Sequence, residues 1–262
     1  MSEILTKGLF GVLFLDNAEA SSTGILALYV ALACVIPAVI GYLLGSINSA
    51  VLISRIFYRE DIRTKGSGNA GMTNMMRTYG KGAAAATLAG DMLKTALSVG
   101  IGALLAAESG MYIAGLFSVI GHVFPVFFGF KGGKGVASTA ALVLCTEPAA
   151  FFVLIFMFVC IVAMSKFLSL GSIMCVMLYP LILNRIYILL RDPNGVPFIP
   201  TLVSFAVMVI VVAKHKDNIQ RLMKGQESKF AFKKSVKPPA SGESEGTPES
   251  DAGDGGKKKK GR

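Results

Sequence analysis

The feature that most constrains this chain is its series of long, uncharged apolar segments. The stretch AAFFVLIFMFVCIVAM at 149–164 is one example, and similar blocks recur along the sequence. Each is close to the roughly 20 residues that a helix needs to cross a bilayer core. A soluble domain would show alternating or one-sided apolar patterns instead. With 53% hydrophobic residues and a mean hydropathy of +0.61, the sequence predicts an all-α integral membrane protein.

Seven membrane-spanning helices are predicted from these blocks. They lie at 24–57, 82–107, 111–130, 135–146, 148–164, 168–190 and 198–213. The region 135–164 could also form one tilted helix. Glu147 and Pro148 favour two helices, because a proline disfavours helical geometry at the residue before it.

The basic residues predict the orientation of these spans. They follow the first, third, fifth and seventh spans: Arg55, Arg59, Arg63, Lys65, Arg77 and Lys81; Lys131 and Lys134; Lys166; and Lys214, Lys216, Arg221 and Lys224. Cytoplasmic connections are enriched in Lys and Arg, so seven spans place the N-terminus outside and the C-terminus in the cytoplasm. With five or six spans, one basic cluster would lie on the wrong side.

Three parts of the chain are predicted: an N-terminal extension at 1–23, a membrane domain at 24–230 and a disordered, charged cytoplasmic tail at 231–262. The extension only weakly resembles a signal peptide, and we expect it to stay uncleaved. The net charge of +10 does not indicate nucleic-acid binding, because the basic residues lie between helices and in the tail. The four cysteines lie in apolar segments without a CxxC pair, so no metal site or cofactor is predicted.

A glycine-dense loop, GSGNAGMTN at 66–74, is the first candidate binding element. Its glycines have the GxGxxG spacing of dinucleotide-binding folds, but the polar REDIRTK precedes it where such a fold needs a buried strand. Glycines can instead turn several backbone N–H groups toward one anion. The predicted phosphate-binding residues are Gly66, Gly68, Asn69, Gly71, Thr73 and Asn74, beside Ser67 and Arg77. A plain flexible loop is the alternative.

A second loop, GFKGGKG at 129–135, has a similar composition. It departs from a P-loop because Phe128 replaces the first glycine and Gly135 replaces the final Ser or Thr. What remains is a second predicted anion site, made of Lys131, Gly132, Gly133, Lys134 and Gly135. Ser169 and Ser172, at the start of the sixth span, are further candidate donors.

The last polar stretch, HKDNIQRLMKGQE at 215–227, places His215, Asn218 and Arg221 near one face of a helix. A histidine at a membrane interface is often structural, but four anion-binding patches on one side of the bilayer favour a functional role. Within the second span, Asp91 and Lys94 can pair across one helical turn. We expect that pair and Glu227 to support the site.

Together these motifs resemble the bacterial acyl-phosphate-dependent glycerol-3-phosphate acyltransferases of the PlsY type. The matching strings are GSINSA (45–50), KGSGNAGMTNMMR (65–77), DMLK (91–94), GHVFPVFFGFKGGKGVAS (121–138), SLGS (169–172) and HKDNIQRLMKGQE (215–227). Asn48, Met72 and Ser138 differ from the residues usual in the family, but none of these differences removes a charge.

The resemblance implies a multi-pass enzyme of the bacterial inner membrane whose site faces the cytoplasm. It would acylate the sn-1 hydroxyl of glycerol 3-phosphate with acyl phosphate, in the first acylation of phospholipid synthesis. Ser67 and Arg77, and His215 and Asn218, would be its catalytic residues. The proton of the hydroxyl could pass to His215 or to a phosphate oxygen of the donor. Expected partners are the two substrates, membrane lipid and the enzyme that forms acyl phosphate.

Two rival classes are a phosphate-ester transporter and a structural membrane scaffold. Transporters bind substrate near the bilayer midplane between repeated halves, and no internal repeat is visible here. A scaffold would not need four donor-rich motifs on one side. The chain also lacks the HxxxxD pair of acyl-CoA-dependent acyltransferases, which argues against a CoA thioester as donor.

Overall fold

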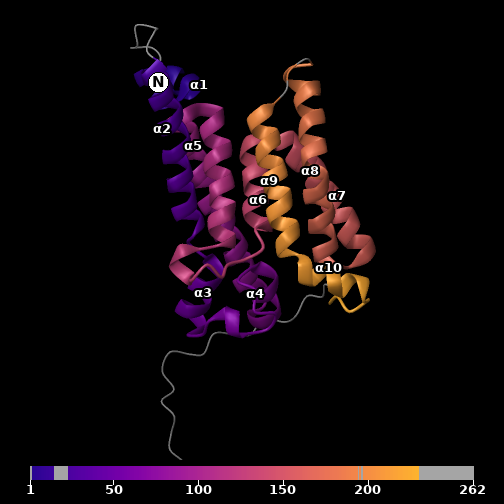
Figure 1. The fold of residues 1–262 in the computed structure, drawn as a ribbon. Helices are drawn as coiled ribbons and strands as arrows, with labels where there is room; N and C mark the ends of the chain where they lie inside the picture. The colour runs from indigo at the N-terminus through magenta and orange to yellow at the C-terminus, as the bar shows by residue number, and fades with distance from the viewer. Residues whose placement is uncertain (1, 15–22, 194, 196, 230–262) are drawn as a thin grey trace, which may run out of the picture.

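The computed structural model describes residues 2–14, 23–193, 195 and 197–229, and this part of the chain is helical without strands. The helices are α1 Ser2–Phe14, α2 Thr23–Gly45, α3 Ser49–Tyr58, α4 Met72–Tyr79, α5 Lys81–Val123, α6 Val136–Thr146, α7 Pro148–Ser165, α8 Leu168–Leu190, α9 Phe198–Lys214 and α10 Lys216–Met223, with 3-10 turns at Ile62–Thr64 and Val126–Phe128 (Figure 1). The tail predicted at 231–262 lies outside the described residues, as does part of the predicted N-terminal extension.

Four helical segments of the described chain are long and apolar enough to cross a membrane: Leu26–Tyr58, Lys81–Phe128, Pro148–Ser165 and Leu168–Leu190. A fifth is reached if α9 and α10, which meet at 59°, form one broken span. The apolar helix α6 is shorter than these. The structure is therefore an all-helical membrane fold with four to five candidate spans, and the count of seven and the orientation stay predictions.

Helix α5 forms two arms: the first corresponds to the predicted span 82–107, and the second to 111–123 of the predicted span 111–130, whose last residues lie beyond the helix in a 3-10 turn and loop. The arms meet at Ala106 and Ala107, whose backbone leaves the helical region, with φ of −142° and 45°. Beyond this bend the second arm packs against the first. A Cβ added to Gly102 would lie 2.1 Å from the carbonyl oxygen of Gly110, so only glycine permits this approach. The two arms form the centre of the bundle, against which α2 and α6 pack.

The single helix predicted over 24–57 is interrupted at residues 46–48, between α2 and α3. The buried side chain of Asn48 accepts a hydrogen bond from the backbone N–H of Val51 at 3.0 Å and so caps α3. Its amide nitrogen donates to the carbonyl oxygen of Ala70 at 3.4 Å. Asn48 therefore attaches the α2–α3 turn to the first glycine loop.

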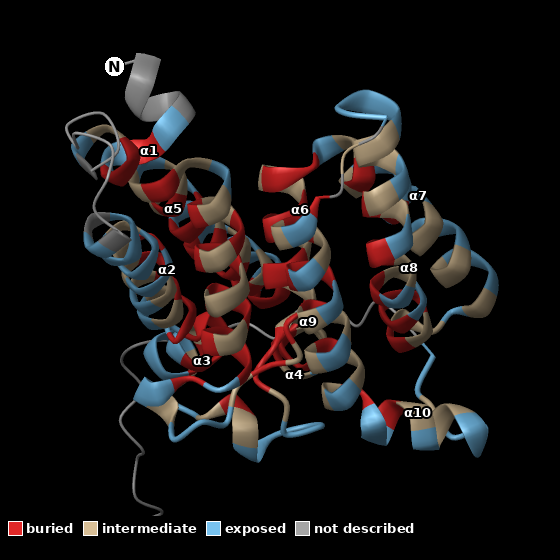
Figure 2. Cartoon of the chain, turned by 45° about the horizontal axis from the view of Figure 1, so that its top comes forward, coloured by how far each residue is buried: buried red, intermediate tan, exposed pale blue. Residues whose placement is uncertain are grey.

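Burial divides the helices into an inner and an outer set (Figure 2). Tyr112 of α5, Leu142 of α6 and Tyr179 of α8 belong to one buried cluster. Phe156 on α7 is 70% exposed, and Val35 on α2 is 57% exposed. Apolar side chains exposed in this way are what lipid would cover in a membrane.

An ion-pair network joins helix ends at the end of the bundle opposite α10. Arg191, which follows α8, lies 2.7 Å from Glu108 in α5 and 3.0 Å from Glu147 at the α6–α7 corner. The hydroxyl of Tyr112 also donates to Glu147, at 3.1 Å. These contacts join the α5 bend, the α6–α7 corner and the end of α8. The candidate site lies at the other end, where α4 and α10 are found (Figure 1).

Candidate active site

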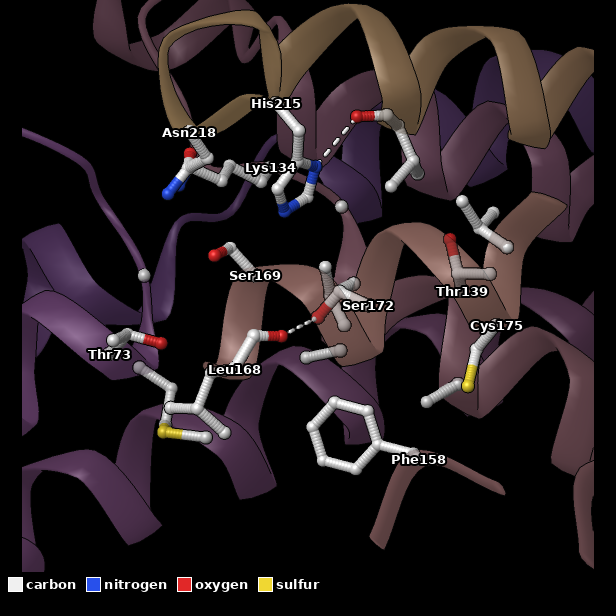
Figure 3. A pocket seen from close by; sticks show the side chains of 18 of the residues that line it. Thr73, Lys134, Thr139, Phe158, Leu168, Ser169, Ser172, Cys175, His215 and Asn218 are labelled. Carbon is white, nitrogen blue, oxygen red and sulfur yellow. Dashed lines mark hydrogen bonds between the residues drawn. The ribbon is translucent and has the colours of Figure 1, made fainter. Parts of the chain in front are cut away.

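A cavity of ≈ 360 Å³ lies among α4, α5, α6, α7, α8 and the junction of α9 and α10. Its polar part contains side chains from four separate segments: Ser67, Asn69, Thr73, Asn74 and Arg77; Lys134; Ser169 and Ser172; and His215, Asn218, Arg221 and Glu227. Figure 3 shows Lys134, Asn218, His215, Ser169 and Thr73 around one space. All four motif regions predicted from the sequence therefore meet at one cavity.

The first glycine loop is shaped by the buried side chain of Asn74. Its amide oxygen accepts a hydrogen bond from the backbone N–H of Ser67 at 2.9 Å. Its amide nitrogen donates to the carbonyl oxygens of Ile62 and Lys65 at 3.2 and 3.0 Å. Gly66 has a φ of 56° in this loop, a conformation that favours glycine. The Asn74 amide nitrogen thus holds the start of the loop, and its amide oxygen holds Ser67 where it lines the cavity.

Lys134 is the cation that the second loop brings into the cavity. Its ammonium donates a hydrogen bond to the side-chain oxygen of Asn218. The pKa of Lys134 is lowered to about 8, chiefly by burial, with the charges of Arg221 and Arg77 adding to the shift and that of Glu227 opposing it. At neutral pH Lys134 is therefore charged, in a partly dehydrated position where it can bind an anion strongly.

Glu227 connects the segment after α10 with the start of α8. Its carboxylate accepts hydrogen bonds from Ser169 at 2.7 Å, Asn218 at 2.6 Å and Arg221 at 2.8 Å. Burial alone would raise the pKa of Glu227, but these three bonds hold the pKa below its ordinary value. Glu227 is therefore charged at neutral pH, and it orients Asn218 toward Lys134.

His215 lies where α9 ends, and it is only 2% exposed. Its ring nitrogen Nδ1 lies 2.7 Å from the carbonyl oxygen of Val211. A carbonyl can only accept, so Nδ1 has the proton and Nε2 has a free lone pair. Burial lowers the pKa of His215, which keeps the ring neutral at pH 7. Figure 3 shows Nε2 turned away from Val211 and toward the space beside Lys134.

The rest of the cavity is an apolar branch between three helices. Its lining residues recur at helical spacing: Val136, Ala137, Ala140 and Val143 on α6; Phe151, Leu154, Ile155 and Phe158 on α7; and Leu168, Cys175, Val176 and Tyr179 on α8. The stripe on α8 from Ser169 to Tyr179 extends roughly 15 Å, at 1.5 Å per residue. A polar end with cations and a long apolar branch thus belong to one cavity.

Most, but not all, of the predicted site residues line this cavity. Those that do are Ser67, Asn69, Gly71, Thr73, Asn74, Arg77, Asp91, Lys134, Gly135, Ser169, Ser172, His215, Asn218 and Glu227. Gly66, Gly68, Lys94, Lys131, Gly132 and Gly133 lie outside the lining. Lys131 is exposed and does not line the cavity that Lys134 enters.

Two further residues belong to the site or join its loops, although the sequence did not predict them as site residues. His122 lines the cavity beside Asp91. Arg63 donates to the carbonyl oxygen of Phe128 at 2.7 Å and to that of Lys131 at 3.4 Å, and so joins the two glycine loops. His122 lies in the conspicuous GHVFPVF string, which could have indicated it, whereas nothing in the sequence separates Arg63 from the other basic residues of its loop.

The fold and the site define a class: an integral membrane protein with one cavity, near an end of its bundle, that joins a cationic polar part to an apolar part. Among the described residues, no three His, Cys, Asp or Glu side chains are grouped to bind a metal ion. Residues 11–225 match the family model described as glycerol-3-phosphate acyltransferase. The chain belongs to this family and is a membrane acyltransferase of phospholipid synthesis.

Individual relatives agree with this assignment. The chain is 38% identical over 195 residues to the glycerol-3-phosphate acyltransferase of Syntrophomonas wolfei, covering 74% of this chain and 96% of the relative. It is similar to the crystal structure of PlsY (YgiH), an integral membrane glycerol 3-phosphate acyltransferase, in its glycerol 3-phosphate form, with a TM-score of 0.68, 30% identity and coverage of 76% and 96%. The lysophosphatidic acid form of that enzyme gives a TM-score of 0.66, 29% identity and the same coverage.

Proposed function

We propose that this chain transfers an acyl group from acyl phosphate to the sn-1 hydroxyl of glycerol 3-phosphate, giving lysophosphatidic acid and phosphate. The observation that supports this best is the joining of a cationic polar end and an apolar branch in one cavity. A donor with a phosphate head and an acyl tail has the same two parts. The similar PlsY enzyme has been solved in a glycerol 3-phosphate form and a lysophosphatidic acid form.

Two anionic substrates require separated positive charges in the polar end. In the proposal, Lys134 and the backbone N–H of Gly135 bind the phosphate of glycerol 3-phosphate, and Ser67 and Arg77 bind the phosphate of the acyl donor. Asn218 fixes the Lys134 ammonium by accepting its hydrogen bond. Fixed charges in a partly dehydrated site stabilise the transfer without reorganising at the moment of reaction.

The reaction itself needs little covalent chemistry from the protein. The sn-1 oxygen forms a bond to the acyl carbonyl carbon, and the bond from that carbon to the phosphate oxygen breaks. Phosphate is a good leaving group, so positioning of the two substrates can supply most of the acceleration. The proton of the hydroxyl passes either to Nε2 of His215 or to a phosphate oxygen of the donor.

We further propose that the protein resides in the bacterial inner membrane, with the cavity facing the cytoplasm. Glycerol 3-phosphate would enter from water at the polar end, and the acyl donor would enter from the bilayer into the apolar branch. The enzyme that forms acyl phosphate is then a natural partner, because it would supply an amphiphilic donor at the membrane surface.

The test is an assay of the purified protein with glycerol 3-phosphate and either palmitoyl phosphate or palmitoyl-CoA. We expect one phosphate and one 1-acyl lysophosphatidic acid per palmitoyl phosphate, without any ion gradient, and no product from the thioester. Lys134→Ala should abolish the product, and the matched Lys131→Ala should keep it. Uptake of glycerol 3-phosphate into vesicles without acylation would favour the transporter, and product from palmitoyl-CoA alone would refute the acyl phosphate donor.

A further inference from the structure

Three ionisable side chains of α5 are buried together beside the cavity. Asp91 and Lys94 lie on the first arm and His122 on the second, and their exposed fractions are 1%, 5% and 3%. Ionisable groups inside a membrane protein are expensive to bury and tend to have a function. The reaction proposed above uses none of them.

Lys94 holds this cluster together. Its ammonium lies 2.9 Å from the Asp91 carboxylate and 3.0 Å from Nδ1 of His122, and it donates to the carbonyl oxygen of Ile47 at 2.7 Å. Asp91 is also 3.4 Å from Nδ1 of His122. The contacts with Ile47 and His122 are hydrogen bonds that the ammonium donates, and the contact with Asp91 is an ion pair. The orientation of the His122 ring is thereby fixed from one side.

The opposite side of His122 touches the second glycine loop. The backbone N–H of Gly133 donates to the carbonyl oxygen of His122 at 3.1 Å. A Cβ added to Gly132 would lie 2.0 Å from that oxygen, and one added to Gly133 would lie 2.1 Å from Nε2 of the ring. Both glycines therefore pack directly against His122. Lys134 is the next residue in the chain after Gly133.

We propose that His122 is a positioning residue for Lys134. Asp91 and Lys94 orient its ring, the ring and backbone of His122 support Gly132 and Gly133, and this support sets where Lys134 presents its ammonium. The inference rests on the proposed role of Lys134 in binding a substrate phosphate. It predicts that disturbing the cluster weakens phosphate binding more than it slows the chemical step.

A cluster with a merely structural role would affect the thermal midpoint but not the KM. The chain offers a matched control for such a role. Thr95 and Ser118 join the same two arms of α5, with their hydroxyl oxygens 3.0 Å apart. Both are fully buried, and neither lines the cavity. Thr95→Val therefore removes a contact between the arms without touching the loop.

The experiment measures kcat, the KM for glycerol 3-phosphate and the thermal midpoint for His122→Leu, Lys94→Met, His122→Asn and Thr95→Val. His122→Leu and Lys94→Met should raise KM by about tenfold or more, with kcat within about threefold, as expected when a binding interaction is lost. The side-chain amide that His122→Asn introduces reaches the position of Nδ1, so KM should stay within about threefold in that variant. Thr95→Val should leave KM unchanged.

Two outcomes would overturn the inference. One is a lowered thermal midpoint with unchanged KM in Lys94→Met and His122→Leu, as in Thr95→Val, which would make the cluster only structural. The other is an equal KM defect in His122→Asn and His122→Leu. If His122→Leu does not fold, the KM of Lys94→Met is compared with the KM of His122→Asn. A raised KM in Lys94→Met alone supports the inference, and equal KM values refute it. An unmodified chain that forms no product from acyl phosphate would instead refute the proposed function.

Discussion

At the scale of single residues, the proposed role of Lys134 predicts that phosphate binding depends on pH. Its pKa is lowered from the ordinary lysine value to about 8, chiefly by burial, so the charged form is present below pH 8 and is lost above it. The substrate phosphate has its second pKa near 6 and keeps a constant charge over that range. We expect the KM for glycerol 3-phosphate to rise above pH 8, by up to about tenfold per pH unit.

Lys134→Arg should remove this alkaline rise, because a guanidinium does not titrate in the accessible range. Measuring KM between pH 6.5 and 9.5 checks both expectations. The control is Lys131→Arg, which changes an exposed lysine outside the cavity and should keep the rise. An unchanged pH dependence in Lys134→Arg would mean that another group titrates.

A second residue-scale prediction concerns His215. Its Nε2 is unprotonated and faces the cavity, since Nδ1 is engaged with Val211 and burial lowers the pKa of the ring. We expect His215→Gln to lower kcat by about 100-fold or more, in the range of general-base contributions, with little change in the KM for glycerol 3-phosphate. Single-turnover rates measure the chemical step directly. A rate within tenfold of the unmodified chain would assign the proton to a phosphate oxygen of the donor.

At the scale of helices, the apolar branch should determine which acyl chains are accepted. Ala140 of α6 lines the branch midway between Val136 and Val143. Ala140→Phe would place a phenyl ring in this space. The ring should obstruct long acyl chains and so reduce kcat/KM for palmitoyl phosphate about tenfold relative to octanoyl phosphate. The KM for glycerol 3-phosphate should stay the same, because the polar end is untouched.

The matched control for Ala140→Phe is Val159→Phe on α7. Val159 is 56% exposed and does not line the cavity, so a phenyl ring there would point into lipid. Comparing octanoyl, lauroyl and palmitoyl phosphates in both variants gives a profile of chain length. Identical profiles would show that the acyl chain binds somewhere else.

The helices were largely predictable from the sequence, because uncharged runs and breakers such as Pro148 mark them directly. The interruption at 46–48 was not, since it depends on Asn48 capping α3 and reaching Ala70 across the fold. The bend of α5 at Ala106 and Ala107 lies inside the predicted span 82–107, at its last two residues. The close approach of Gly102 and Gly110 appears only when both arms are in place.

The candidate site, too, was only partly predictable from the sequence. Glycine and lysine motifs indicated which loops meet, because anion-binding composition is local. The sequence could not separate Lys131 from Lys134, which differ only in the direction their loop gives them. His122 is held by contacts with Lys94 and Asp91 on the other arm of α5, and these residues lie 28 and 31 positions away in the chain.

At the scale of the whole molecule, the two ends of the bundle differ in charge. The cavity end contains Arg77, Lys134 and Arg221, of which Arg221 is paired with Glu227, whereas at the other end Arg191 is paired with both Glu108 and Glu147. Cytoplasmic connections of membrane proteins are enriched in Lys and Arg. We therefore expect the cavity end to face the cytoplasm and the Arg191 end to face outward.

Cysteine labelling in intact cells tests this orientation, in a chain whose four native cysteines are replaced by alanine. A membrane-impermeant maleimide should label Asp192→Cys, next to Arg191, in intact cells. It should label Lys224→Cys, which follows α10, only after the inner membrane is opened. Both positions are exposed and lie outside the cavity lining, so acylation activity should persist and show that each chain is correctly folded. The reverse pattern would place the cavity on the outer face, where glycerol 3-phosphate from the cytoplasm could not reach Lys134, and the proposed function would then require a different supply of substrate.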